Sequence, residues 1–203
     1  TDLHLVNTKF IQCTSTSFGA GAYIGGAAFI TSSLFQSNTA SFGGGGLYTG
    51  GGAEISNSSF ISNTATSRSG GGAYLFGTAL VTNTQFVANV AGNAGGGLFA
   101  NSRADISNSS FISNTAPNWP GGGAKVGGVA LITKTLFIAN VSGADGGGLA
   151  IVSASEGSVS NNLFARNLAG SGNGDAIYML DTRCLALVNC AAPALRTGAS
   201  HAG

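Results

Sequence analysis

One segment of eleven residues, ISNSSFISNTA, occurs twice in this chain of 203 residues, at 55–65 and again at 106–116. Looser copies of the segment lie between and around these two, so the interval between them holds two repeats. Self-similarity at a fixed period is the signature of repeat architectures, and it restricts the fold more than any other feature of the chain.

A phenylalanine marks each copy of the repeat. It recurs every 25 to 27 residues, at Phe10, Phe35, Phe60, Phe86, Phe111, Phe137 and Phe164. Three residues later comes an asparagine in all copies but the first, which has Cys13: Asn38, Asn63, Asn89, Asn114, Asn140 and Asn167. A run of glycines precedes most copies. A unit of this size cannot bury its apolar side chains alone, so we expect successive units to stack.

The residues before each phenylalanine alternate in character. The position five residues before it is always apolar: Leu5, Ile30, Ile55, Val81, Ile106, Ile132 and Val159. The preceding position, six residues before the phenylalanine, varies freely: His4, Phe29, Glu54, Leu80, Asp105, Leu131 and Ser158. This period of two predicts β-strands, and the Gly-Gly pairs at the turns count against helices.

The repeat therefore predicts an all-β solenoid, a right-handed, single-stranded parallel β-helix over residues 1–180. We expect about eight coils of 25–27 residues, three short strands in each coil, and a rise of ~4.8 Å per coil. Residues 181–203 break the pattern and are expected to form a degenerate last coil or a capping tail. The phenylalanines would stack internally. The asparagines would lie at a turn, because Asn tolerates left-handed backbone and its amide can bond from coil to coil.

Composition excludes several function classes. Charged residues make up 7% of the chain and the net charge is +1, so there is no electrostatic case for binding nucleic acid or an acidic membrane. No apolar run reaches the ~18 residues of a membrane span. The three cysteines, Cys13, Cys184 and Cys190, form neither a disulfide framework nor a metal-ligand spacing, and no metal or cofactor is expected. The chain opens within its repeat at Thr1, so a mature product or a fragment is expected.

The repeated Gly-Gly-Ala/Leu followed by Phe-x-x-Asn resembles the passenger repeats of chlamydial polymorphic outer-membrane proteins. It is also similar to repeats of large secreted bacterial proteins with pectin-lyase-like folds. The glycine motifs that carry the resemblance are Gly45 to Leu47, Gly71 to Ala73, Gly96 to Leu98, Gly122 to Ala124 and Gly147 to Leu149. The match covers roughly residues 3 to 180. The resemblance implies a β-helix that is secreted or displayed at the cell surface, often an adhesive one, and it implies no catalytic residue.

A row of aromatic residues is the first candidate for a functional surface. Tyr23, Tyr48, Tyr74 and Phe99 lie twelve residues before their phenylalanines, and Lys125 continues the row. Because Lys125 shares this position, we expect the row to point outward. Exposed aromatic rings ~4.8 Å apart could stack on sugar rings or contact a protein of a host or neighbouring cell. The alternative is a purely structural role, in which the stacked aromatic rings stiffen the surface of the sheet.

Two columns of hydroxyls lie four and two residues before the phenylalanines, and they suggest an ice-binding lattice as an alternative. They are Thr31 and Ser33, Ser56 and Ser58, Thr82 and Thr84, Ser107 and Ser109, Thr133 and Thr135. A flat Thr-x-Thr lattice resembles the ice-binding faces of β-helical antifreeze proteins. Serine in alternate coils lacks the methyl group that such faces use.

A third column follows the phenylalanine by one residue and is apolar: Ile11, Ile61, Val87, Ile112 and Ile138. If the strand alternation continues, these side chains point outward and form a seam for a partner. If the strand bends at the turn, they point inward, which is the expectation preferred here.

An enzyme, either a polysaccharide lyase or a hydrolase, is the minority interpretation. Glu54 and Asp105 share a column two coils apart, which would suit an inverting glycosidase, but no third carboxylate, arginine partner or long loop is expected to join them. Neither end of the repeat has an evident cap, so self-association along the solenoid axis into a filament is a further alternative. The preferred interpretation is a non-catalytic adhesion or scaffold module, secreted or on the cell surface, that binds through the aromatic row.

Overall fold

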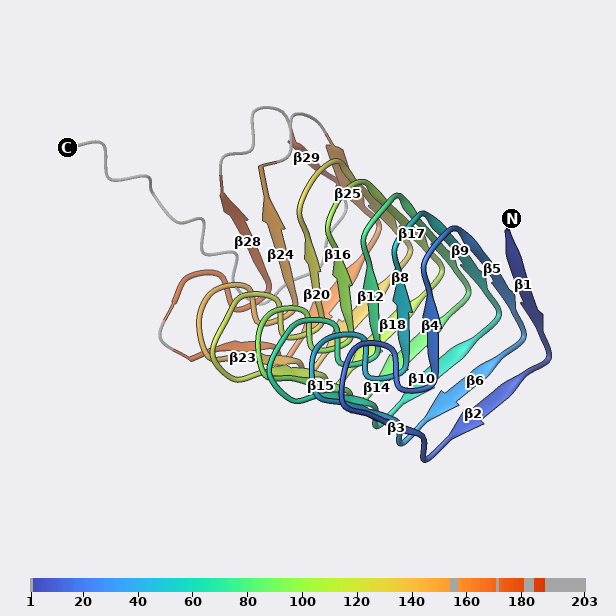
Figure 1. Ribbon diagram of the computed structural model, residues 1–203. Coiled ribbons are helices and arrows are strands. Elements are labelled where there is room, and N and C mark those ends of the chain that lie inside the picture. The colour runs from blue at the N-terminus through green and yellow to red at the C-terminus, as the bar shows by residue number, and fades with distance from the viewer. Residues whose placement is uncertain (1, 154–156, 171, 181–184, 189–203) are drawn as a thin grey trace.

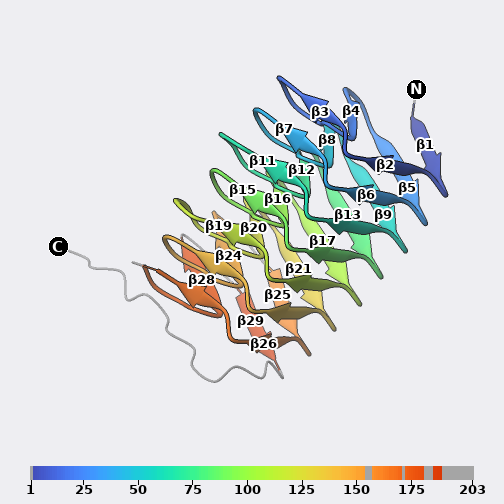
Figure 2. The same cartoon turned by 90° about the horizontal axis from the view of Figure 1, so that it is seen from below.

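The structure is a computed structural model that describes residues 2–153, 157–170, 172–180 and 185–188, the last four by their backbone only. The described chain is a parallel β-helix that contains strands and turns but no α-helix or 3-10 helix. Each strand pairs with the equivalent strand of a neighbouring coil (Figure 1). Seven coils contain four strands each, and β29 begins the next coil. Coils are numbered here from the N-terminus, each starting at a strand of sheet A. Figure 2 shows them stacked in sequence order.

Four sheets run along the solenoid. Sheet A consists of β1 (Leu3–Val6), β5 (Ala28–Thr31), β9 (Ala53–Ser56), β13 (Ala79–Thr82), β17 (Ala104–Ser107), β21 (Ala130–Thr133), β25 (Gly157–Ser160) and β29 (Leu185–Val188). Sheet B consists of β2 (Lys9–Ile11), β6 (Leu34–Gln36), β10 (Ser59–Ile61), β14 (Gln85–Val87), β18 (Ser110–Ile112), β22 (Leu136–Ile138) and β26 (Leu163–Ala165).

The other two sheets complete each coil. Sheet C consists of β3 (Thr14–Ser15), β7 (Thr39–Ala40), β11 (Thr64–Ala65), β15 (Val90–Ala91), β19 (Thr115–Ala116), β23 (Val141–Ser142) and β27 (Leu168–Ala169). Sheet D consists of β4 (Ala22–Ile24), β8 (Leu47–Thr49), β12 (Ala73–Leu75), β16 (Leu98–Ala100), β20 (Ala124–Val126), β24 (Leu149–Val152) and β28 (Ile177–Leu180). The segments from sheet C to sheet D, called the C–D loops below, are the rounded loops in Figure 1.

The expected β-helix is confirmed, with two differences. Each coil has four strands where three were expected, because the strands of sheet C are two residues long and too short to show alternation. Sheet A also continues past residue 180, since β29 pairs with β25 in parallel. The rest of the expected tail, and Cys184 and Cys190, lie outside the described residues.

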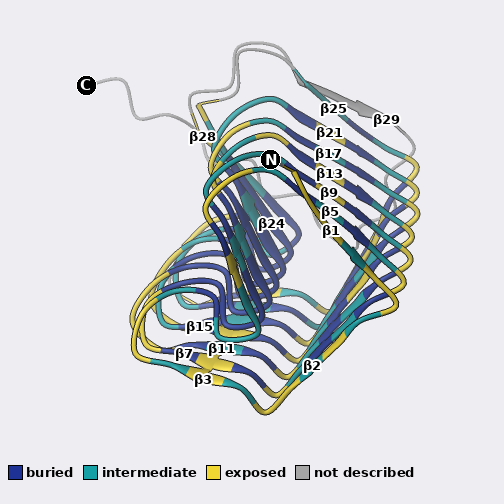
Figure 3. Ribbon diagram, turned by 45° about the vertical axis from the view of Figure 1, so that its right-hand side comes forward, coloured by how far each residue is buried: buried dark blue, intermediate teal, exposed yellow. Residues whose placement is uncertain are grey.

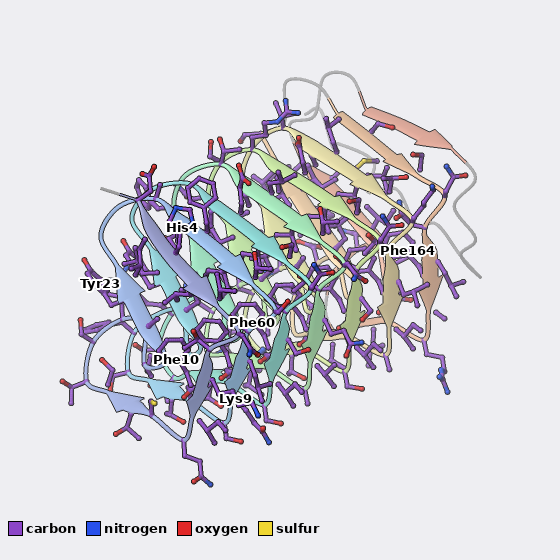
Figure 4. The ribbon with its side chains drawn as sticks, turned by 90° about the vertical axis from the view of Figure 1, so that its right-hand side faces the viewer. His4, Lys9, Phe10, Tyr23, Phe60 and Phe164 are labelled. Carbon is purple, nitrogen blue, oxygen red and sulfur yellow. The ribbon has the colours of Figure 1, made fainter. Side chains whose placement is uncertain are left out.

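The seven phenylalanines form one internal stack, as predicted. Neighbouring rings lie 4.6–4.9 Å apart between centroids and are nearly parallel, and Phe35 through Phe164 are fully buried. Figure 4 shows Phe10, Phe60 and Phe164 along this interior row, whereas Tyr23 projects from the surface. The isoleucines and valines of sheet A face the same interior and complete the core, which Figure 3 shows in dark blue.

The asparagines form a buried ladder at the turn from sheet B to sheet C. Asn89 is typical: its backbone N–H and its Nδ2 both donate to Oδ1 of Asn114, at 3.0 and 2.9 Å. Its Nδ2 also donates to the carbonyl of Phe60 at 2.9 Å. The predicted bonding from coil to coil is confirmed, but the expected left-handed backbone belongs to the residue before each asparagine, such as Ala88 with φ 54°. The positive φ of the preceding residue turns the chain, so the asparagine side chain points into the interior.

The apolar column of sheet B points outward, so the preferred inward orientation was wrong. Ile61, Val87, Ile112 and Ile138 are half-buried and Ile11 is exposed, while the phenylalanine before each of them faces the core or its open end. The strand alternation continues to the end of the sheet B strand, because the backbone reverses only at the next residue, where φ becomes positive.

Candidate binding surface

The three tyrosines of the predicted row lie side by side on the outer face of sheet D. Tyr23, Tyr48 and Tyr74 are direct neighbours in the register of β4, β8 and β12. Tyr23 is the most exposed, at 61%, and its ring stacks on that of Tyr48 with centroids 5.0 Å apart and an interplanar angle of 4°. Tyr48 and Tyr74 are half-buried and their rings are tilted by 32°. We call these three residues the tyrosine row.

The other two predicted members differ from the tyrosines. Phe99 continues the register but is only 8% exposed, so it supports the row and does not present a contact surface. The half-buried Lys125 places its Nζ over the ring of Phe99, 5.1 Å from the centroid. Burial lowers the pKa of Lys125. The accessible aromatic part of the predicted site is therefore confined to the first three coils.

Phe18 adds a ring that the sequence did not single out. It comes from the first C–D loop, and its centroid lies 4.8 Å from that of Tyr48 and 6.3 Å from that of Tyr74. The equivalent residue one coil later is Gly43, where a Cβ atom would lie 3.0 Å from the ring of Tyr74 and 3.3 Å from that of Phe18. The signal was a large aromatic residue directly before Gly19, at a position that is otherwise small.

Two phenols of the row, those of Tyr48 and Tyr74, have raised pKa values. Burial, and then the neighbouring Tyr23, raise the pKa of Tyr48. Burial and then Tyr48 raise the pKa of Tyr74, while the charge of Arg68 opposes that rise. Neutral phenols at ordinary pH offer both a hydroxyl donor and a flat apolar ring to a ligand.

Charge is distributed unevenly around the solenoid. The segments that build sheet D and its loops in the first five coils (16–26, 41–51, 66–77, 92–102 and 117–129) contain Arg68 and Lys125 and no acidic residue. The carboxylates of Glu54 and Asp105 lie on the outer face of sheet A instead. The tyrosine row is therefore bordered by positive charge alone.

The predicted hydroxyl lattice is not flat. Thr31, Ser56, Thr82, Ser107 and Thr133 are half-buried at the ends of sheet A strands, but their partners turn into the interior. Ser33, Ser58, Thr84, Ser109 and Thr135 are at most 4% exposed. Ser58, for example, accepts the N–H of Ser33 at 3.0 Å and donates to the carbonyl of Ser56 at 2.8 Å. The chain turns between the two columns, where Asn57 has φ 50°, so the expectation of one flat face was wrong.

The two carboxylates on sheet A line a shallow hollow. It has a volume of about 300 Å³, and its walls include Phe29, Glu54, Leu80 and Asp105. A second hollow of about 330 Å³ lies between Leu80 and Leu131 and shares Asp105. The expectation that no arginine joins the pair was wrong, because Arg103 bonds Oδ2 of Asp105 at 2.8 Å. Oδ1 of Asp105 is buried and has no hydrogen-bond partner.

The described part of the chain contains no cluster of three or more histidine, cysteine, aspartate or glutamate side chains that could hold a metal ion. None of its residues forms a helix of the length and apolar character needed to span a membrane. Comparisons with protein-family models, with curated proteins and with solved structures give no match for this chain.

Proposed function

We propose that this chain is a non-catalytic binding module, secreted or displayed at a cell surface, whose tyrosine row contacts a glycan or a surface protein. One observation carries the proposal. The chain fully buries its phenylalanine stack from Phe35 onward, yet on sheet D it displays the exposed Tyr23, stacked parallel on the half-buried Tyr48. Exposed stacked aromatics on a rigid sheet are a feature of interaction sites.

The geometry suits a flat, partly apolar ligand. Parallel rings 5.0 Å apart cover each other's inner faces, so the row presents its ring edges and the outer face of Tyr23, its first ring, to the C–H groups of a sugar or to an apolar side chain. Their hydroxyls remain available at the edge for hydrogen bonds. The β-helix fixes the backbone of the row, so little conformational entropy is lost when a ligand binds.

The test replaces Tyr23 and Tyr48 with alanine, singly and together, and measures binding to a glycan array and to intact cells. Loss of a central aromatic contact costs about 2 kcal/mol, so the double variant should bind at least about tenfold more weakly. Leu163→Ala, at a 39% exposed position on the outer face of sheet B, is the matched control and should bind as the unchanged protein does. Equal binding by all variants would contradict the proposal.

A catalytic result would replace the proposal. If the protein cleaved a polysaccharide and Asp105→Asn abolished that cleavage while both tyrosine variants kept it, the chain would be an enzyme that acts through sheet A. Unaltered glycans after prolonged incubation, together with binding that depends on the tyrosines, would favour the binding module.

A further inference from the structure

The C–D loops carry a second outward-facing column beside the tyrosine row, and the ring of Phe42 in this column stacks on that of Phe18 with centroids 5.5 Å apart. Its members lie two residues before the positive-φ glycine of the first six loops and follow one another up the solenoid: Ser17, Phe42, Arg68, Asn93, Trp119 and Ala144. Backbone bonds from Phe42 N to Ser17 O and from Asn93 N to Arg68 O, both 3.0 Å, show that the residues stack. We call this column the loop crest.

The loop crest concentrates exposed side chains of the types that dominate protein interfaces. Phe42 is 40% exposed and Trp119 is 55% exposed. Between them, the exposed Arg68 lies over the ring of Phe42, with its Cζ 5.7 Å from the centroid. Within the described chain the single ion pair joins Arg103 and Asp105, so Arg68 has no carboxylate partner.

The outer face of sheet A carries the complementary column. Phe29, Glu54, Leu80, Asp105 and Leu131 are successive neighbours in its register. Glu54 is exposed and forms no ion pair within the described residues, and Asp105 keeps one oxygen without a donor. Two hollows, of about 300 and 330 Å³, lie along this column.

The two columns match coil by coil. Coil 2 holds Phe42 on the crest and Phe29 on sheet A, and coil 3 holds Arg68 and Glu54. Coil 5 holds Trp119 and Asp105, and the hollow of about 330 Å³ beside Asp105 can receive the indole ring. Both columns rise by the same ~4.8 Å per coil, so all three pairs can form at once only when two molecules lie at equal height and point the same way.

We propose that the loop crest of one molecule docks on the outer face of sheet A of a second copy, side by side and in axial register. A displacement of one coil would place Arg68 against Phe29 or Leu80 and would leave both charges unpaired. An exposed ion pair contributes little to the stability of a contact. Burial of Phe42 and Trp119 against the sheet A hollows therefore provides most of the stability, and the charges select the register. The contact is heterologous, so it repeats from molecule to molecule.

The test is a charge exchange followed by sedimentation velocity over a range of protein concentrations. The unchanged protein should associate as its concentration rises, and Arg68→Glu and Glu54→Arg should each weaken that association severalfold, because each variant places two like charges at the contact. The double variant Arg68→Glu/Glu54→Arg should regain it, because every contact then contains the reversed pair. Lys9→Glu, at an exposed position on sheet B, is the control and should associate normally.

Several results would overturn the proposal. They are a protein that stays monomeric at every concentration, association that survives both single variants, and a double variant that is no better than the singles. Small-angle scattering adds a check on direction, since side-by-side pairs widen the particle, whereas end-to-end pairs would lengthen it. Glu54→Arg should leave binding by the tyrosine row intact, so failure of this contact is distinguishable from failure of the binding function.

Discussion

Replacing Asn114 with alanine removes one link of the buried asparagine ladder, and its cost can be worked out from the bonds that are lost. The Oδ1 atom of Asn114 accepts from the backbone N–H and from Nδ2 of Asn89. Its Nδ2 donates to the carbonyl of Phe86 at 2.9 Å and to Oδ1 of Asn140 at 3.0 Å. Asn114 is fully buried, so water cannot replace these partners.

Two buried donors of Asn89 lose their acceptor in this variant. Each buried polar group left unsatisfied costs about 1–3 kcal/mol, so Asn114→Ala should lower the free energy of unfolding by about 2–6 kcal/mol. That loss is a large part of the about 5–15 kcal/mol that stabilises an ordinary domain. The variant should unfold at a clearly lower denaturant concentration.

The assay is equilibrium unfolding in urea followed by circular dichroism, with Ser113→Ala as the matched control. Ser113 is exposed and has φ 55°, and the equivalent positions in neighbouring coils are already alanine, Ala88 and Ala139. The control should stay within about 0.5 kcal/mol of the unchanged protein, as exposed substitutions usually do. If Asn114→Ala were no less stable than Ser113→Ala, the ladder would not stabilise the solenoid as argued.

Three further predictions concern packing and titration. Phe111→Ala should lower the free energy of unfolding by about 3–5 kcal/mol, as measured by thermal or urea unfolding. Phe10→Ala, at the half-buried end of the stack, should lower it clearly less, and equal losses would contradict the stacked core. Gly97→Ala should destabilise by about 1–3 kcal/mol, because its Cβ would lie 2.7 Å from a backbone oxygen of the next coil, whereas Gly25→Ala meets no atom within 4 Å and should be neutral. Burial, and then the adjacent phenol, raise the pKa of Tyr48 above its usual value of about 10. This stabilisation is present below the unfolded pKa and is lost as pH rises through the folded pKa, so Tyr48→Phe should reduce the alkaline loss of stability and remove one late-titrating phenol from the absorbance curve.

The repeat predicts the interior of this molecule well, for a physical reason. A residue that must pack against its own copy one coil away is constrained to recur, so Phe60 and Asn63 could be assigned to an internal stack and a bonded turn by their spacing alone. Their period also gave the parallel register, which the pairing of Phe60 with Phe86 confirms. The sheet C strands escaped prediction because two residues cannot display a period of two.

The outer surface was harder to predict, because exposure depends on where the backbone turns. Ser33 shares a face with Thr31 only in an extended strand, and the positive φ of Ser32 rotates it into the interior. Phe99 occupies the same column as Tyr23, yet its neighbours cover it, which no spacing reveals. The loop crest has no fixed composition, so Phe42 and Trp119 became a column only when the coils were seen stacked.

Both proposals depend on one claim: that equivalent residues of successive repeats lie in straight columns, one coil apart. The most direct measurement is the distance between spin labels on Ser37→Cys and Arg166→Cys in a chain whose three native cysteines are serine. Both positions are exposed, have φ 54°, and precede the ladder asparagines of coils 2 and 7. Five coil spacings predict a narrow distance distribution near 24 Å, and moving the first label to Ser62 should shorten it by ~4.8 Å. A broad distribution, or a distance that does not shorten by one coil spacing, would contradict the claim.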